Sequence, residues 1–329
     1  MISREQQLIR DIFAPLTVQE PGAFGLRDDA AVLTTGADDD LVLTADMLVA
    51  GVHFLPGDPP DLIARKALRV NLSDLAAKGA DPRSYLVSLA LTGETGGEWV
   101  QGFADGLARD QGIYGCHLLG GDTVKTPGPL TVSVTAVGHV PQGRMVRRAG
   151  AAPGDLIYVS GTIGDSALGL AVHSGEMVPG DLNAGELDDL RQRYLLPQPR
   201  VVLAPVVREH ASAAMDISDG LAGDVALLCD VSGVSAELTV GRVRLSPAAA
   251  KVCDADRQWL ETALTGGDDY ELLICVAPSK RDAFERAAED AGVAVGRIGY
   301  IVAGKEPPVF RDQGGRSYRF ENLSYSHLK

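Results

Sequence analysis

AMDISDGL, residues 214–221, joins a predicted β-strand to a predicted helix through a turn that carries Asp216 and Asp219. An apolar run that ends in a carboxylate, followed by glycine and a second apolar run, is typical of a strand-to-helix loop in a mixed α/β protein. Aspartates lie at predicted turns in four other stretches as well: GLRDDAAV (25–32), TADML (44–48), NLSDLA (71–76) and LGGDT (119–123). We therefore expect folding to gather these carboxylates into one site.

Clustered carboxylates repel one another unless multivalent cations lie between them. Mg²⁺ takes oxygen ligands, retains water and bridges phosphate groups, so the pattern predicts a Mg²⁺–phosphate site. The sequence contains no GxxxxGK[ST] loop, no GxGxxG loop and no HRD or DFG signature of protein kinases. A nucleotide would therefore be held through carboxylates and metal ions.

The length of the chain indicates how many domains it has, and its net charge limits the kinds of ligand it can bind. A chain of 329 residues suggests two domains. The formal net charge of −14 disfavours binding to nucleic acid or to an anionic membrane, because such binding depends on clustered basic residues. An acidic chain that binds an anionic nucleotide requires metal ions between the two.

The cysteines and the N-terminus favour a cytoplasmic protein. The four cysteines are too widely spaced for a CxxC pair or a disulfide framework, which indicates free thiols. The N-terminal MISREQQLIRDIFAPL carries charges through its apolar stretch and predicts an amphipathic helix, not a secretory signal. No apolar run reaches the roughly 18 residues of a membrane span.

Strands and helices alternate in the first half. Asp61, after Pro59 and Pro60, is expected to cap a helix that runs to Gly79, and a second helix is expected over 97–112. β-Branched content and alternation predict strands at 31–33, 41–45, 85–91, 116–119 and 130–137.

RRAGAAPGD (147–155) has few large apolar residues, and we place the domain boundary there, which predicts domains 1–148 and 149–329. In the second domain, strands are predicted at 156–160, 213–217, 236–240, 270–276 and 293–302. Helices are predicted near 164–174, 186–195, 219–231 and 279–291.

Several of these residues also have simpler explanations. Asn71, Asp74 and Lys78 form a polar stripe that could be a solvated helix face. Asp219 alone could be a helix N-cap. The run Asp38–Asp40 is expected to be an exposed turn without chemistry.

GLRDDAAVL, TADMLVAGVHF, ALRVNLSDLAAKGADP, LLGGDTV, VSGTIGDSALGL, RYLLPQPR, AMDISDGL and TGGDDYELL follow in this order over residues 25–273. Together they resemble the thiamine-monophosphate kinase family, in the superfamily that includes aminoimidazole ribonucleotide synthetase. The resemblance implies a two-domain mixed α/β (α+β) fold whose N-terminal sheets pair into a barrel across a homodimer. It also implies ATP-dependent phosphorylation of thiamine monophosphate.

The resemblance further implies the roles of individual residues. The Mg²⁺ ligands would be Asp29, Thr44, Ala45, Asp46, Asp74, Asp122, Asp216 and Asp219, with Ala45 ligating through its carbonyl. ATP would contact Gly121, Asp122, Arg148 and Ser218, and thiamine monophosphate would contact His53, Asp268 and Tyr325. Catalysis would rest on Asp46, Asp122 and Arg148.

Other functions share the same residue pattern. Another ATP-dependent enzyme of the superfamily is one alternative, and a two-metal phosphatase or a metal-stabilised binding protein is another. Selenophosphate synthetase is disfavoured because no cysteine precedes Cys116. The hydrogenase-maturation enzyme is disfavoured because the sequence ends in YSHLK, without a terminal cysteine.

Overall fold

The computed structural model describes residues 9–21, 23, 36–176, 178–312 and 314–324. The chain forms two compact units, one drawn from Met1–Leu75 and Ala80–Gly143 and the other from Ala76–Gly79 and Arg144–Lys329. The last turn of one helix thus belongs to the second unit. In the described residues, no helix is both long and apolar enough to cross a membrane.

The first unit is built on a four-stranded sheet in the order β1-β4-β2-β3. Its strands are β1 (Asp39–Val49), β2 (Asp81–Leu91), β3 (His117–Lys125) and β4 (Thr131–Pro141). Neighbouring strands are antiparallel except for the parallel pair β2 and β3. Consequently β1 and β3 form the two edges of the sheet.

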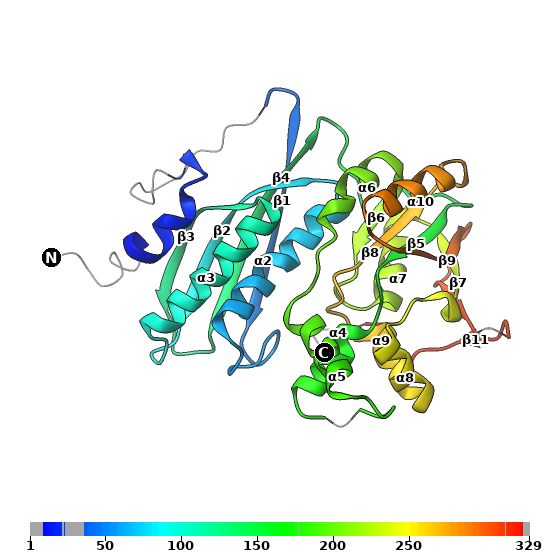
Figure 1. Cartoon of the computed structure of the whole chain (residues 1–329). Helices are drawn as coiled ribbons and strands as arrows, with labels where there is room; N and C mark the ends of the chain where they lie inside the picture. The colour runs from blue at the N-terminus through cyan, green and yellow to red at the C-terminus, as the bar shows by residue number, and fades with distance from the viewer. Residues whose placement is uncertain (1–8, 22, 24–35, 177, 313, 325–329) are drawn as a thin grey trace. The chain divides into compact units, whose positions relative to one another are not determined.

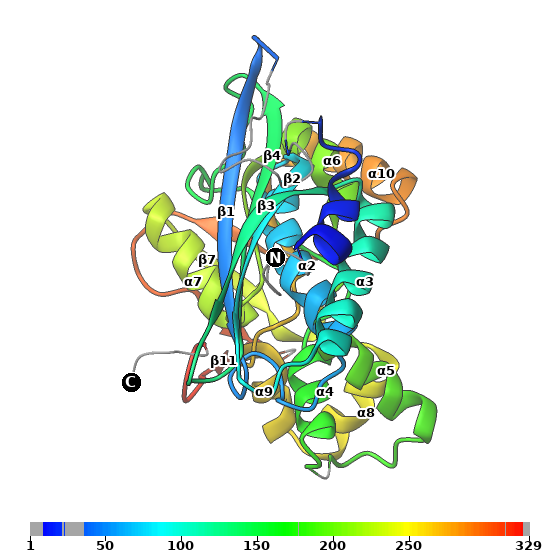
Figure 2. The ribbon, with the colours of Figure 1, turned by 90° about the vertical axis from the view of Figure 1, so that its left-hand side faces the viewer.

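Two helices, α2 (Pro60–Ala77) and α3 (Gly97–Tyr114), cover one face of this sheet (Figures 1 and 2). Along β1, Val42 and Leu48 are buried, whereas Leu43 and Met47 are exposed. This period-two pattern means that one sheet face packs on the helices, while in the described part of the chain the other face exposes apolar side chains.

The N-terminal and helix-boundary predictions differ from the structure in detail. Within the stretch predicted as an N-terminal helix, the described residues form two short helical segments, Ile9–Phe13 and Ala14–Thr17, and residues 1–8 lie outside the described part of the chain. Helix α2 begins at Pro60, which suits the first helical turn because proline lacks an N–H, so Asp61 lies inside that turn. The predicted strand at 31–33 lies outside the described residues.

The second unit is built on a seven-stranded sheet in the order β11-β10-β7-β9-β5-β8-β6. All neighbours are antiparallel except β7 and β10, which run parallel. The strands are β5 (Leu156–Ser160), β6 (Ala211–Asp216), β7 (Ser235–Thr239), β8 (Leu272–Val276), β9 (Val295–Val302), β10 (Val309–Arg311) and β11 (Ser317–Tyr318).

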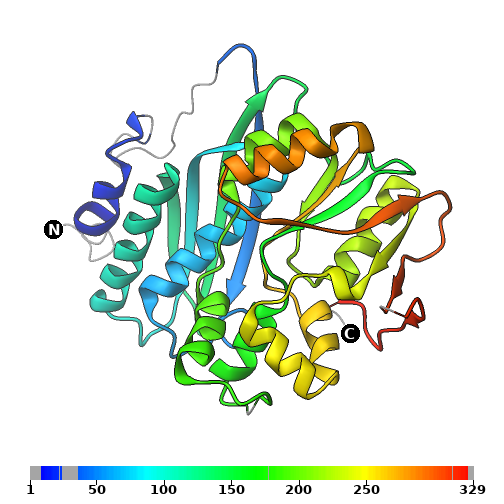
Figure 3. The same cartoon turned by 45° about the vertical axis from the view of Figure 1, so that its right-hand side comes forward.

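Helices cover both faces of this sheet (Figure 3). The short helix α6 (Ala204–His210) and α10 (Arg281–Asp290) pack on Tyr158 and Ile274. Helix α7 (Leu221–Ser232) packs on the opposite face, against Ile157 and Leu273. Adjacent residues of one strand thus serve opposite cores, which explains why these strands are apolar throughout.

A third apolar cluster joins helices beside the sheet. It contains Leu168 of α4 (Asp165–His173), Leu190 of α5 (Ala184–Leu195) and Val252 of α8 (Pro247–Ala255). Helix α9 (Gln258–Thr265) precedes the loop that leads into β8. The pattern-based prediction missed α6, α8 and α9, because each has fewer than ten residues and shows little more than two turns of periodicity.

Candidate active site

In the first unit, the predicted ligands of β1 and α2 come together. Thr44 and Asp46 occupy even positions of β1, the same parity as the buried Val42 and Leu48, so they point toward the helices. The Thr44 hydroxyl donates a hydrogen bond to Asp74 Oδ2 of α2. Thr44 and Asp74 therefore supply oxygen atoms to one place, and Asp46 lies on the same face of β1.

The polar stripe of α2 divides into different environments. Asn71 is fully buried, and its amide Nδ2 donates to the carbonyl of Ala67 at 3.0 Å. The ammonium of Lys78 donates to the carbonyl of Ala214 at 2.9 Å, within the second unit. The alternative of a solvated face is wrong, because only half-exposed or buried residues occupy the stripe.

Asp122 and Gly121 lie on β3, at the other edge of the sheet from Asp46. Asp46 pairs with Val134, Val134 with Val87, and Val87 with Gly121, so one row crosses the whole sheet. Three strand spacings separate β1 from β3 by about 14 Å along the sheet. A Mg²⁺–oxygen bond is about 2.1 Å, so Asp46 and Asp122 of one chain do not share an ion directly.

Gly121 has a structural reason to be glycine. A Cβ atom there would lie 1.8 Å from the carbonyl oxygen of Val87 in β2. Any larger residue would force β2 and β3 apart, so the glycine is needed for strand pairing whichever ligand it meets. Asp122, next to it, is exposed.

His53 lies in the turn after β1. Its Nδ1 accepts the backbone N–H of Val49 at 3.0 Å, so the proton of the neutral ring is on Nε2. The carbonyl of His53 accepts the buried ammonium of Lys66 at 2.9 Å, which holds the turn in place.

The oxygen donors of this unit fit Mg²⁺ in kind. Carboxylate and hydroxyl oxygens are hard ligands, and no thiolate or imidazole stands among Thr44, Asp46, Asp74 and Asp122. Among the residues described, however, no group of three or more Asp, Glu, His or Cys side chains is arranged to hold a metal ion by itself. Asp29, a further predicted ligand, lies outside the described residues.

In the second unit, two predicted site loops are joined by backbone hydrogen bonds. Asp216 ends β6, and the chain continues through Ser218 and Asp219 into α7. The carbonyl of Ser218 accepts the N–H of Asp268 at 2.8 Å, and the carbonyl of Ile217 accepts the N–H of Tyr270 at 2.9 Å. The loop predicted to bind metal and ATP therefore holds the loop predicted to bind the acceptor.

The loop that carries Asp268 has an unusual backbone. Gly267, Asp268 and Tyr270 have φ values of +76°, +64° and +50°. Non-glycine residues in this left-handed region cost about 1–2 kcal/mol each, so neighbouring contacts must impose the conformation. A Cβ on Gly267 would lie 2.4 Å from the Ser218 carbonyl, which explains the glycine.

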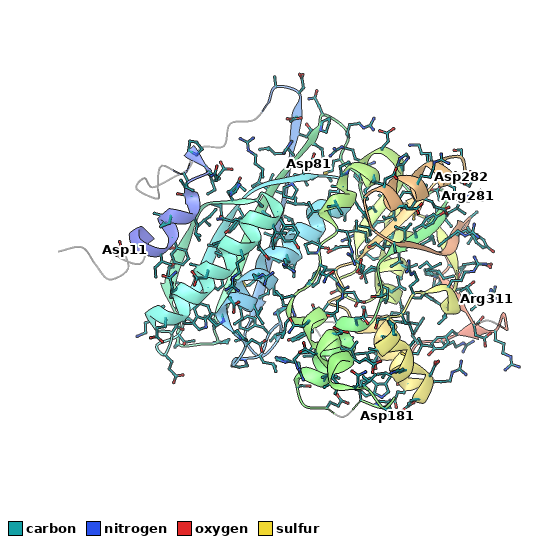
Figure 4. All side chains as sticks on the ribbon, in the orientation of Figure 1. Asp11, Asp81, Asp181, Arg281, Asp282 and Arg311 are labelled. Carbon is teal, nitrogen blue, oxygen red and sulfur yellow. The ribbon has the colours of Figure 1, made fainter. Side chains whose placement is uncertain are left out.

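Two buried carboxylates flank Tyr270. Asp269 accepts the N–H groups of Gly164 and Ser166 at the start of α4, and burial raises its pKa well above the usual range. Glu271 is fully buried and accepts hydrogen bonds from Arg193, Arg200 and the hydroxyl of Ser160. By contrast, the Arg281–Asp282 pair lies exposed on α10 (Figure 4).

Arg148 and the carboxylate of Asp224 border the Asp216–Asp219 loop. The carbonyl of Arg147, the preceding residue, accepts the N–H of Ala214 in β6 at 3.1 Å. Asp224 accepts the N–H of Asp219 at 3.2 Å; burial and the charge of Asp219 raise its pKa to about 7, while Arg148 acts in the opposite direction.

The expectation that Asp219 caps α7 is wrong. Gly220, and not Asp219, occupies the N-cap position. Its φ of +114° and the Thr265 backbone, 2.6 Å from where a Cβ would lie, require glycine at this position.

Several residues around the site were not selected from the sequence: Asp224, Asp269, Glu271, Arg193 and Arg200. The signal was partly legible, since Asp269 and Glu271 follow Asp268 within GGDDYE, and Arg200 ends RYLLPQPR. Nothing in the spacing indicated that these segments meet. Tyr325, a predicted acceptor contact, lies outside the described residues.

Comparison with known proteins agrees with this architecture. Residues 27–140 match the N-terminal domain of the AIR synthase related proteins, and residues 152–311 match their C-terminal domain. The chain therefore belongs to the AIR synthase related family, with its mixed α/β two-domain fold.

More specific relatives narrow the assignment. The thiamine-monophosphate kinase of Caulobacter vibrioides is 44% identical over 300 residues, covering 90% of this chain and 84% of the relative. A crystal structure of thiamine-monophosphate kinase from Stenotrophomonas maltophilia has a TM-score of 0.83 at 37% identity and covers 96% of this chain and 98% of its own. A structure of AaThiL complexed with AMPPCP and TMP has a TM-score of 0.78 at 31% identity, covering 94% and 98%. The chain belongs to the thiamine-monophosphate kinase family and is a kinase.

Proposed function

We propose that this kinase transfers the γ-phosphate of ATP to thiamine monophosphate, giving ADP and thiamine diphosphate. The observation that carries the proposal is the likeness to AaThiL complexed with AMPPCP and TMP, which extends over nearly the whole of both chains. The same likeness disfavours a phosphatase or a metal-stabilised binding protein.

The acceptor needs no general base. A phosphate monoester has a second pKa near ~6, so its attacking oxygen is largely deprotonated at neutral pH. The obstacle is the approach of two anions in line, and the chain's task is to hold and screen them.

We assign the metal ligands to Thr44, Asp46, Asp74, Asp122, Asp216 and Asp219, together with Asp29 and the carbonyl of Ala45. Bound Mg²⁺ would neutralise phosphate charge as it shifts during transfer. Gly121, Asp122, Arg148 and Ser218 would contact ATP, and His53, Asp268 and Tyr325 the acceptor. Arg148 adds positive charge for the triphosphate, and Asp46 and Asp122 orient the phosphates through metal.

We further propose a homodimer in which two N-terminal sheets close into a barrel. The support is the apolar face that the first unit leaves uncovered, where Leu43 is 63% and Met47 58% exposed. Among the described strands, β1 and β3 form the edges of the sheet, and an edge strand offers backbone groups with which a second copy can pair.

In such a dimer, each active site would draw on both chains. Asp46 and Asp122 lie on opposite edges, so joining β1 of one protomer to β3 of its partner would place the two strands that carry them side by side. This arrangement reconciles their predicted shared role with the 14 Å that separates β1 and β3 along one sheet, an estimate of about three strand spacings.

The charge and cysteine content support a cytoplasmic enzyme that binds neither nucleic acid nor membrane. Its four cysteines are all buried as free thiols, and its net charge is −14. ATP and thiamine monophosphate are the partners in this proposal.

An assay with ATP, Mg²⁺ and thiamine monophosphate tests the reaction. A kinase yields ADP and a diphosphate ester, whereas release of inorganic phosphate alone would contradict the proposal. Asp122→Asn should lower kcat/KM on the order of 100-fold, because one metal-binding oxygen is lost. Asp105→Asn, an exposed change on α3, is the matched control and should leave activity unchanged.

Mixing two inactive variants tests the shared site. Asp46→Asn and Asp122→Asn subunits, reassorted at random, should recover about a quarter of wild-type activity, because half the dimers then contain one intact site. Mixtures as inactive as their components would count against a site that draws these two residues from different chains.

A further inference from the structure

The loop Gly267–Tyr270 is held in place by side chains to which the proposed function assigns no role. Both Asp268 and Tyr270 adopt left-handed backbone conformations, which are unfavourable for residues with a Cβ. Asp268 is the predicted acceptor contact, so the geometry of this loop decides where that carboxylate lies. The question is which contacts impose the geometry.

Glu271 makes the densest set of contacts at the loop. Its Oε2 accepts Arg200 Nε and Ser160 Oγ, both at 2.6 Å, and its Oε1 accepts Arg193 Nη2 at 2.9 Å and also Arg200 Nη2. The four donors match the four lone-pair directions of a carboxylate. Arg200 binds as a two-pronged fork, which fixes the orientation of the carboxylate as well as its position.

The surrounding backbone is shaped to admit this cluster. A Cβ on Gly161 would lie 2.1 Å from Glu271 Oε1 and 2.5 Å from Arg200 Nη2. Ser160 also accepts the N–H of Leu272 at 2.8 Å, so the same hydroxyl fixes Glu271 and the first residue of β8. Glu271 is thus connected through Ser160 to the start of β8, and in the chain it directly follows the loop Gly267–Tyr270.

Asp269 anchors the middle of the loop. Its carboxylate accepts Gly164 N at 2.8 Å and Ser166 N at 3.4 Å, at the start of α4. Asp165, between those residues, lies 4.0 Å from Arg193 Nε. Arg193 therefore binds Glu271 directly and also faces the start of α4, which donates hydrogen bonds to Asp269.

We propose that Arg193 and Arg200, acting through Glu271, are positioning residues that hold the Gly267–Tyr270 loop in the conformation that presents Asp268 to the acceptor. The inference rests on the proposed function for its substrate, but its structural part does not. A conservative change to one arginine should loosen the loop without unfolding the unit, because Glu271 keeps its other donors and the apolar clusters on both faces of the sheet stay in place.

The test compares Arg193→Lys with Arg191→Lys on the same helix. Arg191 makes an exposed contact of 3.4 Å with Asp188, so its replacement controls for the chemistry of the change. Lysine at 193 keeps the charge but loses the planar donor geometry.

The first readout is amide hydrogen exchange, which does not depend on activity. Asp268 and Tyr270 donate their N–H groups to Ser218 and Ile217, so these amides report the loop directly. In Arg193→Lys, peptides covering 266–271 should exchange at least about tenfold faster, with β7 and β9 peptides unchanged. Equal exchange in the 193 and 191 variants, or uniform acceleration everywhere, would overturn the proposal.

The second readout separates the two substrates. The KM for thiamine monophosphate should rise at least about fivefold in Arg193→Lys, with the KM for ATP within about twofold of wild type. Unchanged acceptor KM in a folded variant would also overturn the proposal. If wild-type protein does not phosphorylate the acceptor, the proposed function fails, and the exchange experiment still decides the role of the arginines.

A second variant covers the case in which Arg193→Lys does not fold. Ser160→Ala removes one neutral donor from Glu271 and leaves both arginines in place. It should accelerate exchange in the same 266–271 peptides, by less than the arginine change. No acceleration in folded Ser160→Ala would contradict the anchoring role of Glu271.

Discussion

Each unit buries one carboxylate against two arginines, and the two clusters hold different things. In the first unit, Asp110 pairs with Arg65 at 3.0 Å and with Arg69 at 2.6 Å. In the second, Glu271 pairs with Arg193 and Arg200. Both carboxylates are fully shielded from solvent, so their local chemistry is nearly the same.

The difference lies in the elements that the pairs connect. Asp110 is on α3 and both of its arginines are on α2, so this cluster fastens one helix to another, with Arg69 also stacked 5.4 Å from the ring centre of Tyr114. Glu271 follows a left-handed loop and its arginines come from α5 and the segment after it. The Asp110 cluster therefore joins two helices, whereas the Glu271 cluster holds the residue that follows the loop of Asp268.

Removing either carboxylate is the strongest way to break this comparison. Asp110→Ala and Glu271→Ala should each lower the free energy of unfolding by about 3–5 kcal/mol, because two largely buried guanidinium groups lose their partner. Urea denaturation measures both. Near-equal losses would confirm that the clusters are energetically alike, whereas a loss below about 1 kcal/mol in either would show that its arginines find other partners.

Asp269, a second buried carboxylate beside Tyr270, should make the stability of the second unit depend on pH. Its folded-state pKa is raised by burial, so between the unfolded value of about 3.9 and the folded one the native state retains a proton that the unfolded state releases. Wild-type stability should therefore fall as pH rises through that window. Because asparagine does not titrate, the free energy of unfolding of Asp269→Asn relative to wild type should rise by up to about 1.4 kcal/mol per pH unit within that window.

Denaturation at pH 5 and pH 8 measures this slope. Asp282→Asn is the control, because Asp282 is exposed and its pKa is lowered, so its ionisation is complete in both states over that range. A pH-independent difference between Asp269→Asn and wild type would show that Asp269 is already ionised in the folded protein at pH 5.

Ser160→Ala should have a smaller effect on stability. It removes one neutral hydrogen bond to Glu271 and leaves the buried N–H of Leu272 without its acceptor, which costs about 1–3 kcal/mol. Urea denaturation measures the loss. A value as large as that of Glu271→Ala would mean that the hydroxyl, and not the arginines, carries the anchor.

The smallest effect is expected for an exposed ion pair that also joins α2 and α3, the two helices connected by the Asp110 cluster. Arg109 and Asp61 lie 2.8 Å apart, with side chains 59% and 26% exposed. A double-mutant cycle with Arg109→Ala and Asp61→Ala should give a coupling of about 0.2–1 kcal/mol, because water screens the pair. A coupling above about 2 kcal/mol would remove the distinction between buried and exposed pairs in this unit.

Local patterning predicted most of the regular structure. The β-branched runs at 156–160 and 41–45 became β5 and the centre of β1, and the periodic stretches at 97–112 and 279–291 became α3 and α10. These segments bury one face or both, so their own residue order carries the signal. The strand predicted from Tyr270 begins instead at Leu272, because Tyr270 has a left-handed backbone that no strand admits.

For the candidate site, the sequence predicted the chemistry, and the tertiary structure decided which residues are neighbours. Aspartates at several turns predicted a metal and phosphate site, because carboxylate oxygens are ligands that Mg²⁺ prefers. Strand order then placed Asp46 and Asp122 on opposite edges of one sheet, and folding brought Arg193 and Arg200 to Glu271. Pairings between residues 70 or more positions apart depend on how the sheet is assembled, and no local pattern encodes that order.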